Sequence, residues 1–409
     1  MHAAPLTCEA LVVGAGHAGL AAAIGLVDAG FDTIICGTPE RLANGRTVAL
    51  LDASVQLFKA LGLWPAIEPF ASPLCGLRLV DDAGSIFSAA PVEFRAAEIG
   101  LEAFGWNIEN ADLIDALGAG ARQRANLRWI EDRIASCAFA ADEAQARTSG
   151  DLGIAARLAG AADGRASPMR KSAGIGVSVT KYPQQALTAI LSHSRPHRDF
   201  STEFQTAEGP FTLVPLPGRP GAPFRSSLVW AMSDRQARRR AVLDDKALAS
   251  EIERQSLSML GEIALEGARG LFPVSLQKAD AMIAPRLALV GDSAHALPPI
   301  GAQGLNLGLR DGAHLVEAIA EARALGTDIG GSGMLERYAS LRRLDVAFRA
   351  GAVDAFNRSL LAHSPAINFL RGAGLTALGA IGPLRRLAMR GGIAPLFSTP
   401  EIMRGARSS

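Results

Sequence analysis

The chain has 409 residues, enough for two domains with substantial hydrophobic cores. A net charge of +1 and an aromatic content of 5% argue against nucleic acid as a partner, and no basic stretch carries interleaved aromatic residues. The cysteines, Cys8, Cys36, Cys75 and Cys137, lie far apart, so we expect a reducing compartment and neither a metal site nor a disulfide framework.

Residues 10–36 predict a strand, a glycine-rich turn, a helix and a second strand. The turn has the pattern G-x-G-x-x-G in the context that a dinucleotide-binding unit requires. Its glycines allow a tight turn, the approach of a pyrophosphate and close packing of the helix on the strand. A packing turn without a ligand is the alternative, which this context disfavours. The predicted ligand-binding residues here are Gly14, Gly16, His17, Ala18 and Gly19.

The acidic residue that usually binds the adenosine ribose is displaced in this sequence. Such folds end the second strand with that acid, whereas here the position is Gly37. Glu40 in the next loop, or the backbone, is the candidate replacement. Further along, Arg46 precedes an amphipathic helix that ends at Gly62, and its planar fork could hold a diphosphate. A solvated side chain is the alternative for Arg46.

The middle of the chain alternates between strand patterns and turns. Residues 73–95 and 127–158 predict strands, and a helix is expected to open at Trp106, with Asn110 as a candidate site residue or a helix cap. Asp163 and the glycine after it form either a common turn pair or a ligand-binding loop. Residues 174–277 predict a mostly antiparallel sheet.

In that sheet, Tyr182 and Trp230 are candidate substrate-binding residues, with a core position as the alternative for both. Residues 287–290 then predict a buried strand that presents Asp292 at its end, followed by a glycine- and proline-rich turn and a helix from about residue 306. A loop between core elements is the alternative reading of the turn. The candidate ligand-binding residues in this segment are Asp292, Pro298, Pro299, Gly301, Gly304, Leu305 and Asn306.

The string from Gly291 to Asn306 resembles the second flavin motif of the FAD-dependent aromatic hydroxylases, the single-component flavoprotein monooxygenases. The segment 160–170 resembles their Asp-Gly motif. Residues 45–64 and 209–230 are similar to the ubiquinone-biosynthesis branch of that family. Asn110 matches an asparagine of the branch, but Ala111 stands where the branch has an arginine.

The resemblance implies FAD as the cofactor and NAD(P)H as the electron donor. It implies that Asp292 contacts the ribityl chain and that the backbone after the prolines cradles the isoalloxazine ring. It also places Arg46 and Asn110 at the flavin and assigns Asp163 to FAD and the passing NAD(P)H. Pro298 is a further candidate substrate-binding residue. No side chain is predicted to act as a catalytic acid or base, and His295 is expected to be structural.

The expected fold is α/β (α+β overall), with a Rossmann-like FAD-binding domain interleaved with a substrate domain built on a mostly antiparallel sheet. We assign residues 1–72, 96–173 and 278–350 to the first and 73–95 and 174–277 to the second. Residues 351–409 form a C-terminal helical segment that is basic and amphipathic.

The implied function is NAD(P)H- and O2-dependent hydroxylation of a polyprenylated phenol in ubiquinone biosynthesis, through a flavin C4a-hydroperoxide. Two alternatives stay open: a related flavoenzyme such as a prenyl reductase or an epoxidase, and a non-catalytic FAD-binding subunit of a biosynthetic complex. Oxygen incorporation into the product would separate the hydroxylase from the reductase.

The partners expected beyond the substrate are a membrane surface, through 371–390, and other ubiquinone-biosynthesis proteins. The membrane contact is weighed equally against packing of this segment on the protein body. The apolar stretch 10–27 lacks a preceding Lys or Arg and is read as a buried strand–turn–helix rather than a signal or a span. We therefore expect a cytoplasmic protein, at most peripheral at the inner face of the membrane.

Overall fold

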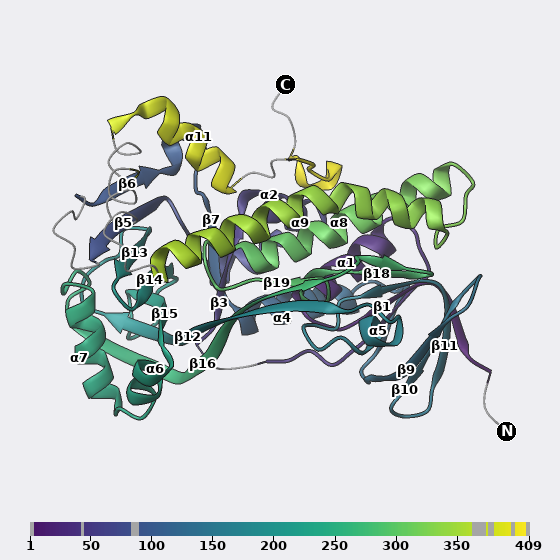
Figure 1. Cartoon of the computed structure of the whole chain (residues 1–409), viewed down its shortest axis with the longest axis horizontal. Coiled ribbons are helices and arrows are strands. Elements are labelled where there is room, and N and C mark those ends of the chain that lie inside the picture. The colour runs from purple at the N-terminus through teal and green to yellow at the C-terminus, as the bar shows by residue number, and fades with distance from the viewer. Residues whose placement is uncertain are drawn as a thin grey trace.

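The computed structural model describes residues 4–41, 45–82, 90–361, 374, 380–393 and 397–405. Within them the strands form two large sheets and a small one of three strands. Long helices run along one face of the first sheet (Figure 1). The expected α/β class, with a Rossmann-like unit and a mostly antiparallel second sheet, is confirmed. The division of the chain into domains stays a prediction.

The first sheet is the core of the Rossmann-like unit. Its central strands run parallel in the order β18 (Leu287–Leu289), β11 (Gly153–Ala161), β1 (Leu6–Val13), β2 (Thr33–Cys36) and β8 (Leu127–Ile130). Antiparallel strands extend it, namely β17 (Ile283–Ala284), β9 (Ile134–Phe139) and β10 (Ala144–Thr148). Every residue of β2 and β18 is buried, as expected for parallel strands that are covered on both faces.

Four helices form the main cover of this sheet and its connections. They are α1 (His17–Asp28), α4 (Asn110–Arg122), α8 (Gln303–Ala324) and α9 (Ser332–Leu361). Leu20 and Ile24 of α1 share a hydrophobic core with Leu309 and Leu315 of α8. Figure 1 shows α8 and α9 side by side above the sheet. Helix α1 directly follows β1, whereas α8 comes after β18 and β19; β1 and β18 lie on either side of β11 in this sheet.

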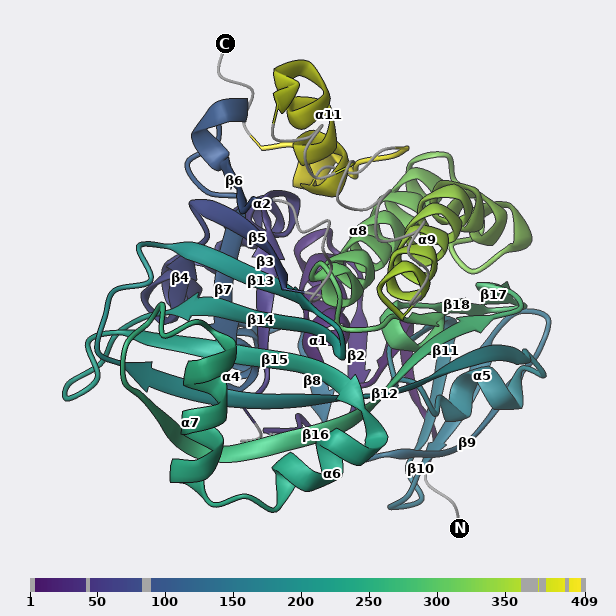
Figure 2. The same ribbon diagram turned by 60° about the vertical axis from the view of Figure 1, so that its left-hand side comes forward.

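The second sheet is antiparallel except where β5 and β13 pair in parallel. Its order is β19 (His295–Ala296), β16 (Ile263–Ala279), β12 (Val177–His193), β15 (Arg225–Ser233), β14 (Gly209–Leu216), β13 (Phe200–Thr206), β5 (Gly76–Asp82) and β6 (Val92–Arg95). One face packs against α6 (Asp234–Ala241) and α7 (Asp245–Gln255), through a core that contains Phe204, Phe211 and Trp230. Figure 2 shows these two helices in front of the sheet. We call this the outer face and the opposite one the inner face.

The small sheet corrects one sequence-based expectation. It joins β3 (Thr47–Leu51), β7 (Gly105–Glu109) and β4 (Ala71–Pro73), with β7 in the middle. The helix predicted to open at Trp106 therefore begins only at Asn110. Pairing of β7 with a strand on each side holds Trp106 to Glu109 extended.

The remaining elements are short or lie near the C-terminal end of the chain. They are α2 (Asp52–Ala60), α3 (Trp64–Ile67), η1 (Glu68–Phe70), η2 (Ala96–Ile99), α5 (Pro168–Ser172), η3 (Gly291–Ser293), α11 (Gly382–Ile393) and η4 (Glu401–Met403). The tail helix expected to begin near Pro383 is confirmed as α11. Residues 371–373 and 375–379, which the membrane prediction also included, lie outside the described residues.

Candidate functional site

The glycine-rich turn between β1 and α1 has the geometry that a phosphate-binding turn needs. Gly14 has a φ of +108°, and a Cβ there would lie 2.3 Å from the carbonyl oxygen of Ala162. A Cβ at Gly19 would lie 2.0 Å from the carbonyl oxygen of Gly14, so helix and strand pack closely. At Gly16, by contrast, no described atom lies within 4 Å of the Cβ position. The turn is thus closed toward the protein and accessible at Gly16.

The start of α1 can receive an anionic group. Gly16 is its N-cap residue, and among the described residues no side chain caps the helix. The first amide groups of a helix need acceptors, and the helix dipole favours negative charge there. A pyrophosphate satisfies both requirements.

His17 and Asn110 connect the beginnings of α1 and α4. The Nε2 atom of His17 lies 3.0 Å from the carbonyl oxygen of Asn110, so the ring donates its proton there. Burial lowers the pKa of His17, which favours the neutral ring. Glu109, not Asn110, is the N-cap residue of α4, and the Oδ1 atom of Asn110 is buried without a partner among the described residues. The helix-cap reading of Asn110 is therefore wrong, and its amide oxygen remains available.

Arg46 and Arg165 both interact electrostatically with the carboxylate of Asp292. The Nε atom of Arg165 lies 3.5 Å from an Asp292 oxygen, and both side chains are nearly half exposed. Arg46 is exposed yet surrounded by protein, and this burial lowers its pKa while Asp292 opposes the shift. Arg46, Arg165 and Asp292 therefore form one accessible charged cluster, and we call the surface around it the cofactor cleft. The Arg46 guanidinium also lies 4.9 Å from the ring centre of Phe272.

The loop that carries Asp163 is joined to the turn that carries Asp292. One Asp163 carboxylate oxygen accepts the backbone N–H of Met169 at 3.1 Å, and Oδ1 is buried without a partner among the described residues. Burial raises the pKa of Asp163. Arg170 donates to the carbonyl oxygens of Ser293 at 2.6 Å and Arg165 at 2.8 Å. Sequence reasoning did not select Arg165 or Arg170, although both stand in the Asp-Gly segment.

The proline-rich turn leads into α8 through a left-handed residue. Pro298 is buried and Pro299 is exposed. Gly301 has a φ of +62°, and Ala302, the N-cap residue of α8, has a φ of +53°. No side chain among the described residues caps α8, and no described atom lies within 4 Å of a Cβ placed on Gly304. The N-terminus of α8 is therefore a second accessible helix start, on the segment that follows Asp292.

The side chain of Asn306 connects the start of α8 to the junction between β3 and α2, and in this sense it is a structural joint. Its Oδ1 atom accepts from the Leu51 N–H at 2.8 Å and the Ser54 hydroxyl at 2.7 Å. Its Nδ2 atom donates to the carbonyl oxygens of Ala49 at 2.8 Å and Ala302 at 2.6 Å. With its side chain used in this way, only the backbone of Asn306 remains for a ligand. Its predicted neighbour Leu305 is partly buried against the core of the Rossmann-like unit.

The position expected to carry the ribose-binding acid has no room for one. A Cβ on Gly37 would lie 2.5 Å from the backbone nitrogen of Ala15. The backbone approach between β2 and the glycine-rich turn thus excludes a side chain there. Glu40 lies in the loop beyond and is exposed.

The two aromatic substrate candidates lie on opposite faces of the second sheet. Trp230 is fully buried on the outer face, between Phe211 and Arg240. Because this face packs on α6 and α7, Trp230 is separated from the flavin-motif loops, and its core reading holds. Tyr182 lies on the inner face, in a cluster with Ala186 and Val274.

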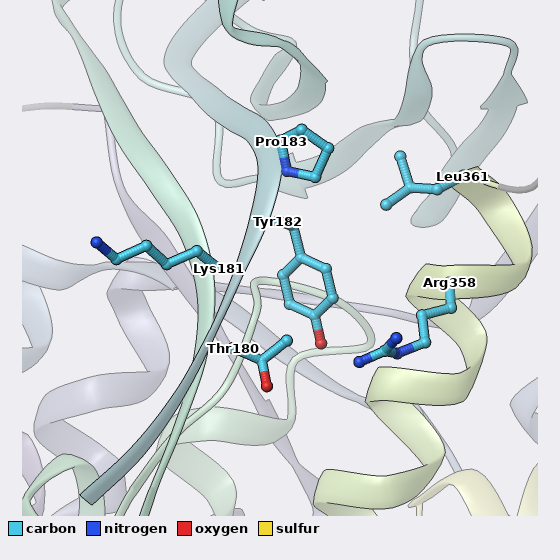
Figure 3. Close-up of a pocket in the computed structure, with 6 residues that line it drawn as sticks. All are labelled: Thr180, Lys181, Tyr182, Pro183, Arg358 and Leu361. Carbon is cyan, nitrogen blue, oxygen red and sulfur yellow. The ribbon is translucent and has the colours of Figure 1, made fainter.

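Tyr182 borders a pocket of about 280 Å³ between β12 and the end of α9. The pocket is lined by Thr180, Lys181, Tyr182, Pro183, Arg358 and Leu361. Figure 3 shows the Tyr182 hydroxyl turned toward Arg358, whereas Lys181 points away. The hydroxyl donates to Asp354 at 2.5 Å. Burial and this carboxylate raise the pKa of Tyr182, so it stays protonated.

His295 belongs to a buried ionic network and not to the cleft. Its Nε2 atom lies 2.6 Å from Asp311, which also pairs with Arg342 at 2.6 Å. All three side chains are fully buried. The structural role expected for His295 agrees with this position between β19, α8 and α9.

Comparison with known proteins identifies the family to which this chain belongs. Residues 7–350 match the family model of the FAD binding domain. The chain belongs to the FAD-dependent aromatic hydroxylases, in the ubiquinone-hydroxylase branch. Ubiquinone hydroxylase UbiL of Rhodospirillum rubrum is 33% identical to this hydroxylase over 97% of this chain and 92% of its own length. The 3-demethoxyubiquinol 3-hydroxylase of Escherichia coli is 30% identical over 93% of this chain and 97% of its own.

Solved structures share the fold of this hydroxylase. The p-nitrophenol 4-monooxygenase PnpA of Pseudomonas putida superposes with a TM-score of 0.78 at 18% identity, over 98% of this chain and all of that one. PqsL of Pseudomonas aeruginosa, a probable FAD-dependent monooxygenase, has a TM-score of 0.75 at 19% identity, over 90% of this chain and 99% of its own. The family assignment makes the protein an FAD-dependent enzyme and sets aside the non-catalytic alternative.

Proposed function

We propose that this hydroxylase acts on the aromatic ring of a polyprenylated phenol in ubiquinone biosynthesis, with NAD(P)H as electron donor and O2 as co-substrate. The observation that carries the proposal is the 33% identity to a ubiquinone hydroxylase over almost the full length of both chains. An aromatic hydroxylase also needs a cofactor cleft beside an apolar wall. The cleft at Arg46 and the inner-face cluster around Tyr182 have those properties.

The residues of the cleft fit FAD. The α1 N-terminus and the accessible Gly16 would receive the pyrophosphate, with Arg46 beside it. Asp292 would bind hydroxyl groups of the ribityl chain, and the α8 N-terminus would face the polar edge of the isoalloxazine ring. The unpaired oxygens of Asn110 and Asp163 would accept further hydrogen bonds. FAD, when bound, supplies electron transfer from NAD(P)H and the activation of O2.

The protein positions the ring of the substrate and keeps water away from it. On the inner face Tyr182, Ala186 and Val274 are buried, and Val229 and Leu361 pack against them. These side chains suit an aromatic ring that carries an isoprenoid chain, because both are apolar. Pro298, buried in the turn before α8, would stand between this wall and the cofactor.

We further propose that the protein is cytoplasmic and contacts the inner face of the membrane, where a polyprenylated substrate would reside. None of the helices in the described part of the chain combines the length and apolar character that a membrane span requires. The support for surface contact is α11, whose Leu384 and Leu387 are 41% and 70% exposed, beside Ile381 at 49%. Arg386 and Arg390 on the same helix suit anionic headgroups. Other ubiquinone-biosynthesis proteins are the proposed alternative partners of this surface.

The decisive experiment is the absorption spectrum of the purified protein, followed by anaerobic NADPH or NADH addition with and without a prenylated phenol. We expect flavin bands that bleach faster when the phenol is present. Aerobic turnover in ¹⁸O2 should then put labelled oxygen into the product, which separates a hydroxylase from a reductase. Efficient oxidation of small phenols with none of prenylated ones would contradict the proposed substrate.

Membrane contact is tested by flotation with vesicles of phosphatidylglycerol or of phosphatidylcholine. We expect binding to the anionic vesicles only, weakened by Leu387→Glu, because that change puts a charge at the more exposed of the two leucines of α11. Val242→Glu is the matched control, since Val242 is equally apolar, 83% exposed and distant from α11 in the chain. Equal binding of both variants and the unmodified protein would contradict the role of α11.

A further inference from the structure

One row of directly paired residues crosses the inner face of the second sheet, and this row includes the carboxyl group of Glu203. Cross-strand partners connect Thr188 with Val229, Val229 with Thr212, Thr212 with Glu203 and Glu203 with Leu79. Partners in one row project to the same face of a sheet. Glu203 is the only member of this row that can carry a charge.

The face to which Glu203 projects follows from its neighbours. Phe204, the next residue, is fully buried in the outer-face core under α6 and α7. Successive strand residues point to opposite faces, so Glu203 points to the inner one. On β15, Trp230 belongs to the same outer core, whereas Val229 packs with Tyr182 and Leu361.

The inner face meets the cofactor cleft. The hydroxyl groups of Thr47 and Ser227 lie 2.8 Å apart, and Thr47 directly follows Arg46. Asn107 of the small sheet donates to the carbonyl oxygen of Pro215 on β14 at 2.8 Å. Strand β14, which lies beside Glu203, is therefore joined to the elements that carry Arg46 and Asn110.

Glu203 is in an environment that suits a proton acceptor. Its side chain is partly exposed, and desolvation by the surrounding protein raises its pKa to about 7. Charged residues on the elements packed around this face include Asp81 of β5, Arg225 of β15, Arg385 of α11, Arg46 before β3, and Asp354 and Arg358 of α9, and none of them contributes to the shift. Asp354 and Arg358 pair with each other.

A second polar group stands on the same strand face. The side chain of Gln205, two residues beyond Glu203, is buried, with an exposed fraction of only 2%. Its Oε1 atom has no partner among the described residues. A buried unpaired acceptor costs stability unless a ligand or water satisfies it. A water molecule, or a hydroxyl of the ligand other than the one that loses its proton, would do so.

We propose that Glu203 is the catalytic base that accepts the phenolic proton of the substrate. This inference rests on the proposed function. The phenol O–H bond breaks, its electron pair stays on the phenolic oxygen, and a new O–H bond forms on the Glu203 carboxylate. The proton returns to the product or passes to solvent after the ring is hydroxylated. The negative oxygen makes the ring a better nucleophile for hydroxylation.

A base is useful here because a phenol resembles tyrosine, whose pKa is about 10. At neutral pH only about one such molecule in a thousand is ionised in water. A base whose pKa lies close to the working pH gives the best compromise between being ionised and holding a proton. Removing such a group typically lowers the rate by roughly 10² to 10⁴ fold.

The test compares Glu203→Gln with Glu262→Gln, which removes a carboxylate from an exposed position before β16. With 2-prenylphenol as the probe, we expect Glu203→Gln to lower kcat about 100-fold or more while FAD content and the Kd of the phenol change little. The Glu262 control should match the unmodified enzyme. Infrared difference spectra across the neutral pH range should show one carboxyl group that ionises and is missing only in Glu203→Gln.

The pH profile separates a base from a structural residue. Activity of the unmodified enzyme should rise through about pH 7, as Glu203 ionises. In Glu203→Gln it should rise only as the phenol itself ionises, and a more acidic prenylated fluorophenol should recover part of the lost rate. An unmodified enzyme that hydroxylates 2-prenylphenol and a Glu203→Gln variant with the same rate and profile would overturn the inference alone. No hydroxylation by the unmodified enzyme would overturn the proposed function and this inference together.

Discussion

Replacing Asn306 with alanine should destabilise the protein and weaken FAD binding, because this side chain joins the start of α8 to the β3–α2 junction. It lies in a fully buried position and forms hydrogen bonds on both its oxygen and its nitrogen. The bond to Ala302 holds the left-handed residue from which α8 starts. Truncation would free that turn and remove four interactions at once.

The magnitude follows from what the four partners lose. The Ser54 hydroxyl can rotate, and a water molecule can satisfy the carbonyl groups of Ala49 and Ala302. The Leu51 N–H is fixed by the backbone, so it carries most of the cost, about 1–3 kcal/mol for a buried donor without a partner. Together with the smaller losses at the other three hydrogen-bond partners, we expect the free energy of unfolding to fall by about 3 kcal/mol. Since unfolding entropy is about 2.1 cal/mol/K per residue, 409 residues make this a Tm decrease of roughly 3–4 °C.

Two measurements check this expectation. Differential scanning fluorimetry of the FAD-free protein gives the Tm change, and titration with FAD should show binding weakened roughly tenfold, or about 1.4 kcal/mol. Gln145→Ala, which removes an exposed amide from the β9–β10 hairpin, is the matched control. An unchanged Tm and unchanged FAD affinity in Asn306→Ala would refute the role of this side chain as a joint.

Three further outcomes follow from the site and its surroundings. Asp292→Ala should yield a folded protein that loses its yellow colour on purification, because the half-exposed carboxylate contributes little to the core; full FAD retention would show that the cleft is misassigned. Trp230→Phe should lower the unfolding free energy by about 1–3 kcal/mol through lost packing with Arg240, yet leave the Kd of a prenylated phenol unchanged. The pKa of Asp311 is lowered from 3.8 to about 2 by His295 and Arg342 against its burial. The contribution of the ionised Asp311 to folding stability is therefore complete above about pH 4 and disappears as pH falls through about 2. Asp311→Asn should accordingly lower the free energy of unfolding at neutral pH and have little effect near pH 2. Equal destabilisation at both pH values would contradict the ionic role of this residue.

The glycine-rich turns and the helix starts could be predicted from local sequence. A left-handed φ or a contact too close for a Cβ restricts a position to glycine wherever the chain folds, as Gly14 and Gly301 demonstrate. The strand before each turn was recognisable because parallel strands are continuously apolar. The helix predicted from Trp106 was wrong because β-pairing with distant segments overrides local preference.

The family, the strand–turn–helix units and the residues that line them could be inferred from the amino-acid sequence. The direction in which side chains face became clear only from the folded chain. Alternation along a strand defines two faces but does not say which one a helix will cover, so Trp230 became core and Glu203 projects to the inner face. Hydrogen bonds across long sequence separations likewise fixed the side chain of Asn306 in a structural role, whereas the side-chain oxygen of Asn110 has no partner among the residues that the structure describes. Such outcomes depend on which distant segments meet, and no local pattern contains that information.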